Sequence, residues 1–189
     1  TQAEIKSLKS GDEVLLTGVI YTARDAAHKR LCELLKENKP LPFNIENATI
    51  YYVGATPKKE NQVIGSAGPT SSYRMDPYMA PLLDAGLKIT IGKGSRSENV
   101  KDLLAEHNAL YLTAIGGAGV VINRTIKKCE LIAYPDLDSE AIYKLEVVDF
   151  PAFVTYDTYD KSRYRNRSIS NSWKRKTIRR IGKLLTIRI

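Results

Sequence analysis

Short apolar segments rich in β-branched residues alternate along this chain with segments of helical periodicity, and this alternation restricts the fold more than any other feature. It is typical of layered α/β domains, in which helices cover a central parallel sheet. The helical segments thin out towards the C-terminus, where we expect additional antiparallel strands. The sequence predicts strands at 13–21, 48–53, 87–91, 109–115, 128–134, 143–149 and 152–156, and helices at 23–38, 73–84, 95–108 and 116–125.

Residue patterns also mark where some of these helices begin and end. Ser95 and Glu98 match the S-x-x-E capping box, so we expect Ser95 to cap the helix that follows. Gly86 comes just after the helix at 73–84, and a glycine there commonly ends a helix in the left-handed conformation. His28 and His107 fall on predicted helices, where we expect surface positions and no part in a Ser-His-Asp triad.

The charge of the chain is unevenly distributed. Eleven of its 29 basic residues and none of its 21 acidic residues lie in 161–189, so residues 1–160 carry a net charge of −3. The overall charge of +8 therefore belongs to the C-terminal segment and does not predict that the body binds nucleic acid. We predict one domain over residues 1–160, followed by a basic tail that is disordered or not native to the protein.

Composition argues against several classes of protein. No run of about 18 apolar residues occurs, so no transmembrane helix is expected. The opening sequence TQAEIKSLKSGDE lacks an apolar signal-peptide core. Cys32 and Cys129 are far apart, which predicts neither a disulfide framework nor a metal site in this chain. We therefore expect a cytoplasmic protein.

Two glycine-rich segments do not match nucleotide-binding motifs. The GKG at 92–94 has glycine where a P-loop requires Ser or Thr after its lysine. The GAG at 117–119 is followed by Ile122 where a dinucleotide fingerprint has a third Gly or Ala. The sequence therefore predicts no nucleotide site.

Three predicted strand-to-helix turns carry cationic side chains. Arg24 opens the first helix, where an anion could lie between the guanidinium and the free amides, or where Asp25 and solvent could simply balance the charge. Thr70 precedes Arg74 in the second turn, where its hydroxyl could face a ligand or could simply cap the helix that follows. Lys93 lies between two glycines in the third turn. These glycines allow a ligand to come close to the lysine, although it could also be a solvated loop residue. If the strands are parallel neighbours, the turns share one sheet edge and suit a small dianionic substrate.

The segments that carry these turns resemble a known family. GDEVLLTGVIYTARDAAHKRL, GSAGPTSSYRMDPYMAPLLDAGLKITIGKGSRS and ALYLTAIGGAG, in that order, resemble the β subunit of class I iron–sulfur hydro-lyases, the fumarate hydratases and L-tartrate dehydratases. The resemblance covers roughly residues 3–157. It implies a swivelling β/β/α domain and a separate α subunit, whose three cysteines hold a [4Fe–4S] cluster. No metal or cofactor ligand is then expected in this chain.

The resemblance also implies roles for single residues. Thr70 matches the threonine proposed to move the proton of the substrate C–H bond. Arg24 and Arg74 match arginines that bind the substrate, and Lys93 matches a substrate-binding lysine. Ser71–Ser72–Tyr73 departs from the family's usual residues, because Tyr73 is bulkier, and this affects the contacts beside Thr70.

Several functions remain open at this stage. Within the family, the expected substrate is fumarate or L-malate, with L-tartrate or a methyl-substituted fumarate as alternatives. The expected partner is the α subunit, and the expected assembly is a hetero-oligomer or a β–β dimer. In a different class, the cations of the tail, with Trp173 among them, could form a nucleic-acid or membrane-surface binding module.

Overall fold

One mixed sheet organises the residues that the computed structural model describes, which are 2–54, 63–114, 119–158 and 185–189. The strand order within these ranges is β5-β6-β4-β3-β2-β1-β7. The strands are β1 (Glu13–Thr22), β2 (Thr49–Tyr51), β3 (Ile89–Gly92), β4 (Leu110–Ala114), β5 (Ile126–Ala133), β6 (Ile142–Tyr156) and β7 (Leu185–Arg188). The α-helices are α1 (Gln2–Ser7), α2 (Asp25–Lys36), α3 (Met79–Asp84), α4 (Glu98–Glu106) and α5 (Gly119–Thr125), and the 3₁₀ helices are η1 (Ser72–Tyr78) and η2 (Pro135–Glu140).

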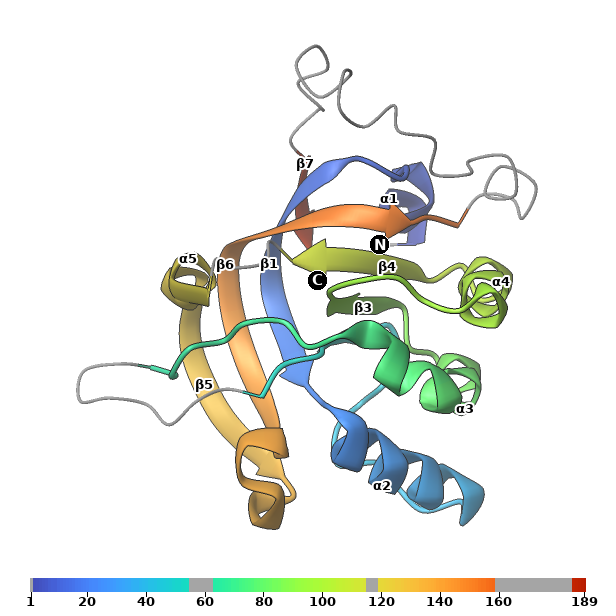
Figure 1. Cartoon of the computed structure of the whole chain (residues 1–189), viewed down its shortest axis with the longest axis vertical. Helices are drawn as coiled ribbons and strands as arrows, with labels where there is room; N and C mark the ends of the chain where they lie inside the picture. Colours follow the sequence, from blue (N-terminus) through green and yellow to red (C-terminus); the bar gives the residue numbers. More distant parts are fainter. Residues whose placement is uncertain (1, 55–62, 115–118, 159–184) are drawn as a thin grey trace.

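The sheet has a parallel part and an antiparallel part. Strands β1, β2, β3 and β4 are parallel neighbours, as the sequence predicted. Strand β6 runs antiparallel to β1, β4 and β5, which confirms the antiparallel strands expected near the C-terminus. Because β6 pairs with both β4 and β1, the sheet curls back on itself (Figure 1). The α/β class is therefore confirmed, whereas the swivelling β/β/α description stays a prediction.

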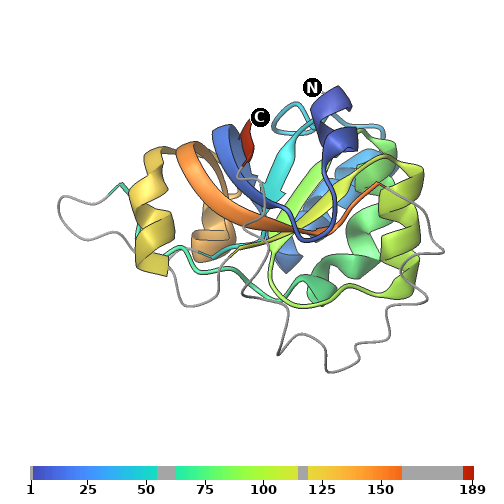
Figure 2. The same ribbon diagram turned by 90° about the horizontal axis from the view of Figure 1, so that it is seen from above.

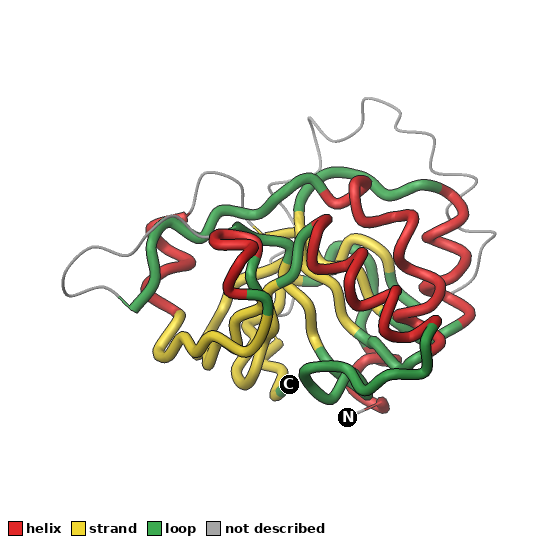
Figure 3. Tube along the Cα trace, turned by 90° about the horizontal axis from the view of Figure 1, so that it is seen from below, coloured by secondary structure: helices red, strands yellow, loops and turns green. Residues whose placement is uncertain are grey.

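Side chains from the two faces of the sheet enter two separate cores. Tyr51 and Val53 pack in a core inside the curled sheet, together with Phe150 of β6. Ile50 and Tyr52 pack in a second core with side chains of helices α2, α3 and α4. These three helices gather on one side of the molecule, and α5 lies on the other (Figure 2). Figure 3 shows the strands between the helices of the two sides.

Two helix starts differ from the prediction. The segment predicted as one helix at 73–84 is a 3₁₀ helix, η1, followed by α3, because Pro77 has no amide to donate to a regular helix. Helix α4 is capped by Ser97 and not by Ser95: Ser97 Oγ accepts a hydrogen bond from the Val100 amide, 3.4 Å away. The prediction for Gly86 is confirmed, since its φ is +106° and its amide donates to the Leu83 carbonyl.

The two strands predicted at 143–149 and 152–156 form one continuous strand, β6. Asp149 has a φ of +55°, and its amide donates to Thr17 Oγ1 of β1 at 3.1 Å. The register of β1 against β6 shifts nearby, between Leu16 and Gly18. This irregularity accommodates the residues around Pro151 without ending the strand.

The last residues of the chain form a strand that the sequence analysis did not predict. Strand β7 pairs parallel to β1, and Ile187 is buried in the inner core. A Cβ at Gly18 would lie 1.7 Å from the Ile189 carbonyl oxygen, so only glycine permits this approach. Residues 161–184, on which most of the tail prediction falls, lie outside the described residues. None of the described helices has the length and apolar character needed to cross a membrane.

Candidate functional site

The three predicted turns lie at the same edge of the parallel sheet. Arg24 follows β1, the loop with Thr70 follows β2, and Lys93 follows β3, and these strands are parallel neighbours. The Thr70 amide donates to the Tyr52 carbonyl at 2.7 Å, at the end of β2. The Lys93 amide in turn donates to the Thr70 carbonyl at 3.3 Å. The structure therefore joins the backbone of the Thr70 loop directly to the Lys93 turn.

Arg24 and Arg74 are brought together by a carboxylate that the sequence analysis treated only as a local counterion. Asp25 Oδ1 lies 2.8 Å from Nε of Arg74, and its Oδ2 lies 3.8 Å from Nη2 of Arg24. Asp25 is the first residue of α2, and η1, which carries Arg74, packs against this helix. One acidic residue thus positions both arginines in front of the N-terminus of α2.

A second carboxylate reaches Arg24 from η2, a segment with no predicted role. Glu140 Oε1 lies 3.1 Å from Nη2 of Arg24. The Arg24 side chain is 20% exposed, and its Nε is buried without a hydrogen-bond partner among the described residues. A Cβ at Gly54 would lie 2.7 Å from Nη1 of Arg24, so any other residue at this position would force the guanidinium to shift. Arg24 is therefore enclosed by α2, η2 and the end of β2.

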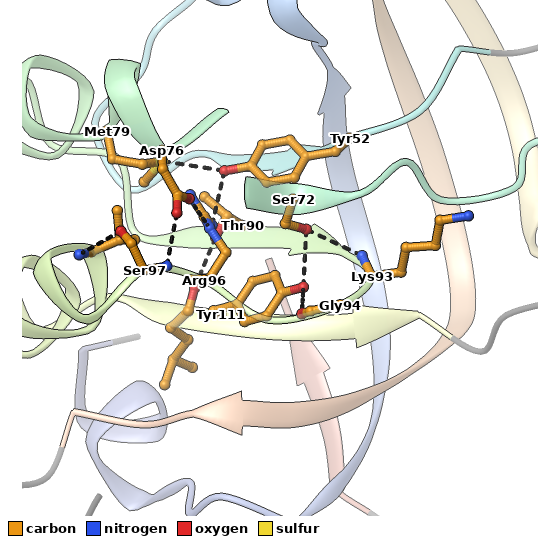
Figure 4. A network of polar contacts seen from close by, with 12 residues as sticks. Tyr52, Ser72, Asp76, Met79, Thr90, Lys93, Gly94, Arg96, Ser97 and Tyr111 are labelled. Carbon is orange, nitrogen blue, oxygen red and sulfur yellow. Dashed lines mark hydrogen bonds and ion pairs between the residues drawn. The ribbon is translucent and has the colours of Figure 1, made fainter. Parts of the chain in front are cut away.

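Hydroxyl groups hold the Thr70 loop and the Lys93 turn in one arrangement (Figure 4). The Lys93 amide lies 3.1 Å from Ser72 Oγ, to which it donates, and the Ser72 and Tyr111 hydroxyls are 2.9 Å apart. Tyr111 donates to the Gly94 carbonyl at 2.7 Å, and burial raises its pKa, so it stays protonated. A Cβ at Gly92 would lie 2.0 Å from Ser72 Oγ, which explains why the first glycine of GKG is required.

Arg96 lies buried beneath these two loops. Its guanidinium is 5.4 Å from the ring centroid of Tyr52 and 5.2 Å from that of Tyr111. Its Nε donates to Asp76 Oδ1 at 2.5 Å, and Asp76 Oδ2 accepts from the Ser97 amide at 2.8 Å. Burial by itself lowers the pKa of Arg96, but Tyr52 and Asp76 outweigh burial and hold it above its ordinary value. Arg96 therefore links η1 to the start of α4 as a charged residue.

His28 is fully buried, so the prediction that it lies at the surface is wrong. The second core, which packs α2 against the sheet, encloses the side chain, and the Tyr52 ring stands edge-on at 5.3 Å. Nδ1 of His28 is 2.9 Å from the Arg24 carbonyl oxygen, which can only accept, so Nδ1 carries the proton. Burial lowers the pKa of His28 to about 4, which makes it neutral at pH 7. His107, by contrast, is partly exposed, as expected.

We expect His28 to make the stability of the chain depend on pH. The unfolded histidine binds a proton below about 6.5, whereas the folded one does so only near 4. The contribution is fully present above pH 6.5 and is lost as the pH falls towards 4, by an amount on the order of 3 kcal/mol. Urea unfolding at pH 7 and 5 measures the first part of this loss, about 2 kcal/mol. His28→Leu should lose less free energy between these values than the wild type, whereas a His107→Gln control should match it.

The edge of the sheet that carries Arg24, Arg74 and Lys93, here called the cationic edge, holds no set of metal ligands among the described residues. No three His, Cys, Asp or Glu side chains within them converge on a point that could hold a metal ion. A shallow hollow of about 600 Å³ lies between η1 and the start of α4. Its lining includes the exposed Tyr73 but not Arg24, Thr70, Arg74 or Lys93. The cationic edge is therefore separate from this hollow.

Comparison with known proteins identifies what this chain resembles. The family model described as Fumarase C-terminus matches residues 1–167. The chain is 41% identical to the anaerobic class I fumarate hydratase of Escherichia coli K12 over 82% of this chain and 29% of the relative. It is 38% identical to fumarate hydratase 2 of Leishmania major over 82% of this chain and 28% of the relative. The chain thus spans less than a third of these enzymes.

A relative of similar length carries a different name. This protein, from Methanocaldococcus jannaschii, is named for the subunit beta of L(+)-tartrate dehydratase. It is 35% identical over 87% of this chain and 87% of its own length. The match therefore extends over nearly the whole of both chains.

Proposed function

Because this chain belongs to the fumarase C-terminus family, we propose that it is the β-type part of a [4Fe–4S]-dependent hydro-lyase that interconverts fumarate and L-malate. One observation carries the proposal: a single sheet edge gathers Arg24, Arg74 and Lys93 around the loop of Thr70. Bidentate arginines and a point-charge lysine suit a dicarboxylate. The fumarate hydratases among the relatives support this substrate class.

In the proposed reaction this chain binds the substrate and moves one proton. Arg24 and Arg74 hold carboxylate groups of the substrate, and Lys93 adds positive charge where negative charge develops. The hydroxyl of Thr70 transfers the proton of the substrate C–H bond. Because this bond is weakly acidic, the transfer needs a closely positioned base. The backbone hydrogen bond from the Lys93 amide to the Thr70 carbonyl holds the two residues next to each other, so that the cation and this hydroxyl can act on the same substrate.

The proposed partner is an α subunit that carries the cluster. The described residues of this chain offer no set of cluster ligands, and Cys32 is buried against the Tyr78 carbonyl. When bound, a [4Fe–4S] cluster with an open iron supplies a Lewis acid for the departing hydroxyl. The relative named for tartrate dehydratase subunit beta supports a partner subunit, in a hetero-oligomer.

L-tartrate is the second candidate substrate. The relative named for tartrate dehydratase subunit beta supports it, since the match spans most of both chains. Tartrate differs from malate by one hydroxyl, and a hydrogen-bonding site discriminates such a group by single contacts. Some of those contacts would come from the α subunit.

Anaerobic co-expression with an α-type hydro-lyase chain tests this function. We expect the assembled complex to convert L-malate to fumarate, and this chain alone to be inactive. Measuring kcat/KM for malate, fumarate and tartrate then assigns the substrate. A complex that assembles with its cluster but acts on none of the three would refute the proposal.

A further inference from the structure

The carboxylate of Glu140 lies where the sequence predicted that an external anion would bind. Its Oε1 is 3.1 Å from Nη2 of Arg24, and its Oε2 accepts a hydrogen bond from the Ala26 amide, 3.4 Å away. Ala26 is in the first turn of α2, so Glu140 lies between a guanidinium and a helix N-terminus. This is the position expected for a substrate carboxylate. In this structure the chain itself supplies the anion.

We propose that Glu140 is an internal counterion that a substrate carboxylate displaces from Arg24, and that it thereby lowers the affinity of the chain for dicarboxylates. The inference rests on the proposed function, because it takes Arg24 as a substrate-binding residue. It assigns to Glu140 a role in specificity and affinity, not in the chemical step.

The contacts of this ion pair make displacement feasible. The side chains of Arg24 and Glu140 are 20% and 25% exposed, and a partly solvated pair of this kind contributes only about 0.2–1 kcal/mol. Nε of Arg24 is buried without a hydrogen-bond partner among the described residues. Glu140 therefore leaves a guanidinium donor unsatisfied. A carboxylate that reached two nitrogens of Arg24 would bind it more strongly.

The backbone of the segment before Glu140 is strained. Asp138 has φ 50° and ψ −114°, and Tyr134, which precedes η2, is left-handed with a φ of +58°. Non-glycine residues in such regions cost about 1–3 kcal/mol and are frequent in segments that rearrange. A bidentate ion pair between Arg30 of α2 and Asp136 holds the start of η2 against that helix. The start of η2 is therefore anchored to α2, whereas the strained residue Asp138 lies two positions before Glu140, at the end that would have to move.

Binding to the full chain, measured without the α subunit, tests the proposal. Amide NMR titrations with fumarate and with L-malate detect millimolar affinities. We expect Glu140→Gln, which keeps the size of the side chain, to bind fumarate about two- to fivefold more tightly than the wild type. Glu37→Gln is the matched control, because it removes one negative charge at the other end of α2, about 18 Å away. Its affinity should equal that of the wild type.

The outcomes separate this inference from the proposed function. If Glu140→Gln binds fumarate no more tightly than the wild type, the displacement is refuted, and Glu140 instead holds Arg24 in place. A gain that persists when Arg24→Ala is added also refutes it, since the extra affinity would not involve this pair. Failure of the proposed function has another signature, in which wild type and variants bind none of the dicarboxylates and the assembled complex is inactive.

Discussion

Replacing Thr70 by alanine should reduce the turnover of the assembled hydro-lyase by at least about 10². The variant loses the hydroxyl that is proposed to exchange the proton of the substrate C–H bond. The loop should keep its place, because its contacts to Tyr52 and Lys93 use the backbone of Thr70. Substrate binding by Arg24 and Arg74 should also survive. We therefore expect kcat to fall with little change in KM.

Two further variants make this experiment decisive. Thr70→Ser retains a hydroxyl and should keep most of the activity. Ser71→Ala removes the neighbouring hydroxyl, which caps no helix in the structure, and should change kcat little. Rates are measured anaerobically as the formation of fumarate from L-malate, with subunit association checked by size-exclusion chromatography. Near-normal turnover of Thr70→Ala in an intact complex would exclude the proposed role.

The parallel sheet and its cationic edge could be predicted because their signals are local. Strand and helix periodicity repeat within a few residues, and parallel strands place the following turns at one edge. Thr70, Arg74 and Lys93 each lie in such a turn, so the sequence alone grouped them. In the structure a backbone hydrogen bond joins Thr70 to Lys93, and an ion pair with Asp25 holds Arg74 beside α2.

The rest of the site could not be predicted, because it depends on contacts between residues far apart in the chain. Glu140 meets Arg24 across 116 positions, and η2 has no periodic pattern that would indicate where it packs. His28 looks like a surface residue because its helix is amphipathic and polar on average. Its burial follows from the aromatic rings of Tyr52 and Tyr78, which approach from other elements. Ser95 matches the capping-box pattern, but Ser97 caps the helix in the structure, where its amide also donates to Asp76, a residue 21 positions away in the chain.

Arg96 gives the second large prediction, since a buried charge loses its compensation when one partner is removed. Its side chain is fully buried, and Asp76 is only 13% exposed. Arg96→Met keeps an apolar chain between the rings of Tyr52 and Tyr111 but leaves the carboxylate of Asp76 without its cation. Removing one partner of a buried pair costs about 3–5 kcal/mol, and we expect a loss of this size in the free energy of unfolding. Urea unfolding followed by circular dichroism measures it.

The double variant Arg96→Met, Asp76→Asn separates the cost of an unpaired charge from the cost of lost packing. The side-chain amide that Asp76→Asn introduces can still accept the hydrogen bond from the Ser97 amide through its oxygen, and it carries no charge. If the unpaired carboxylate causes the loss, the double variant should be more stable than Arg96→Met alone. If the double variant is equally unstable, the stacking of the guanidinium between two tyrosine rings is the larger contribution.

In either case, Arg96→Met removes the residue that anchors η1 to the start of α4. We therefore expect the amides of the Thr70 loop and of the Lys93 turn to become less protected from hydrogen exchange, and to do so together. Unchanged stability and protection in Arg96→Met would show that this buried pair does not hold the site together.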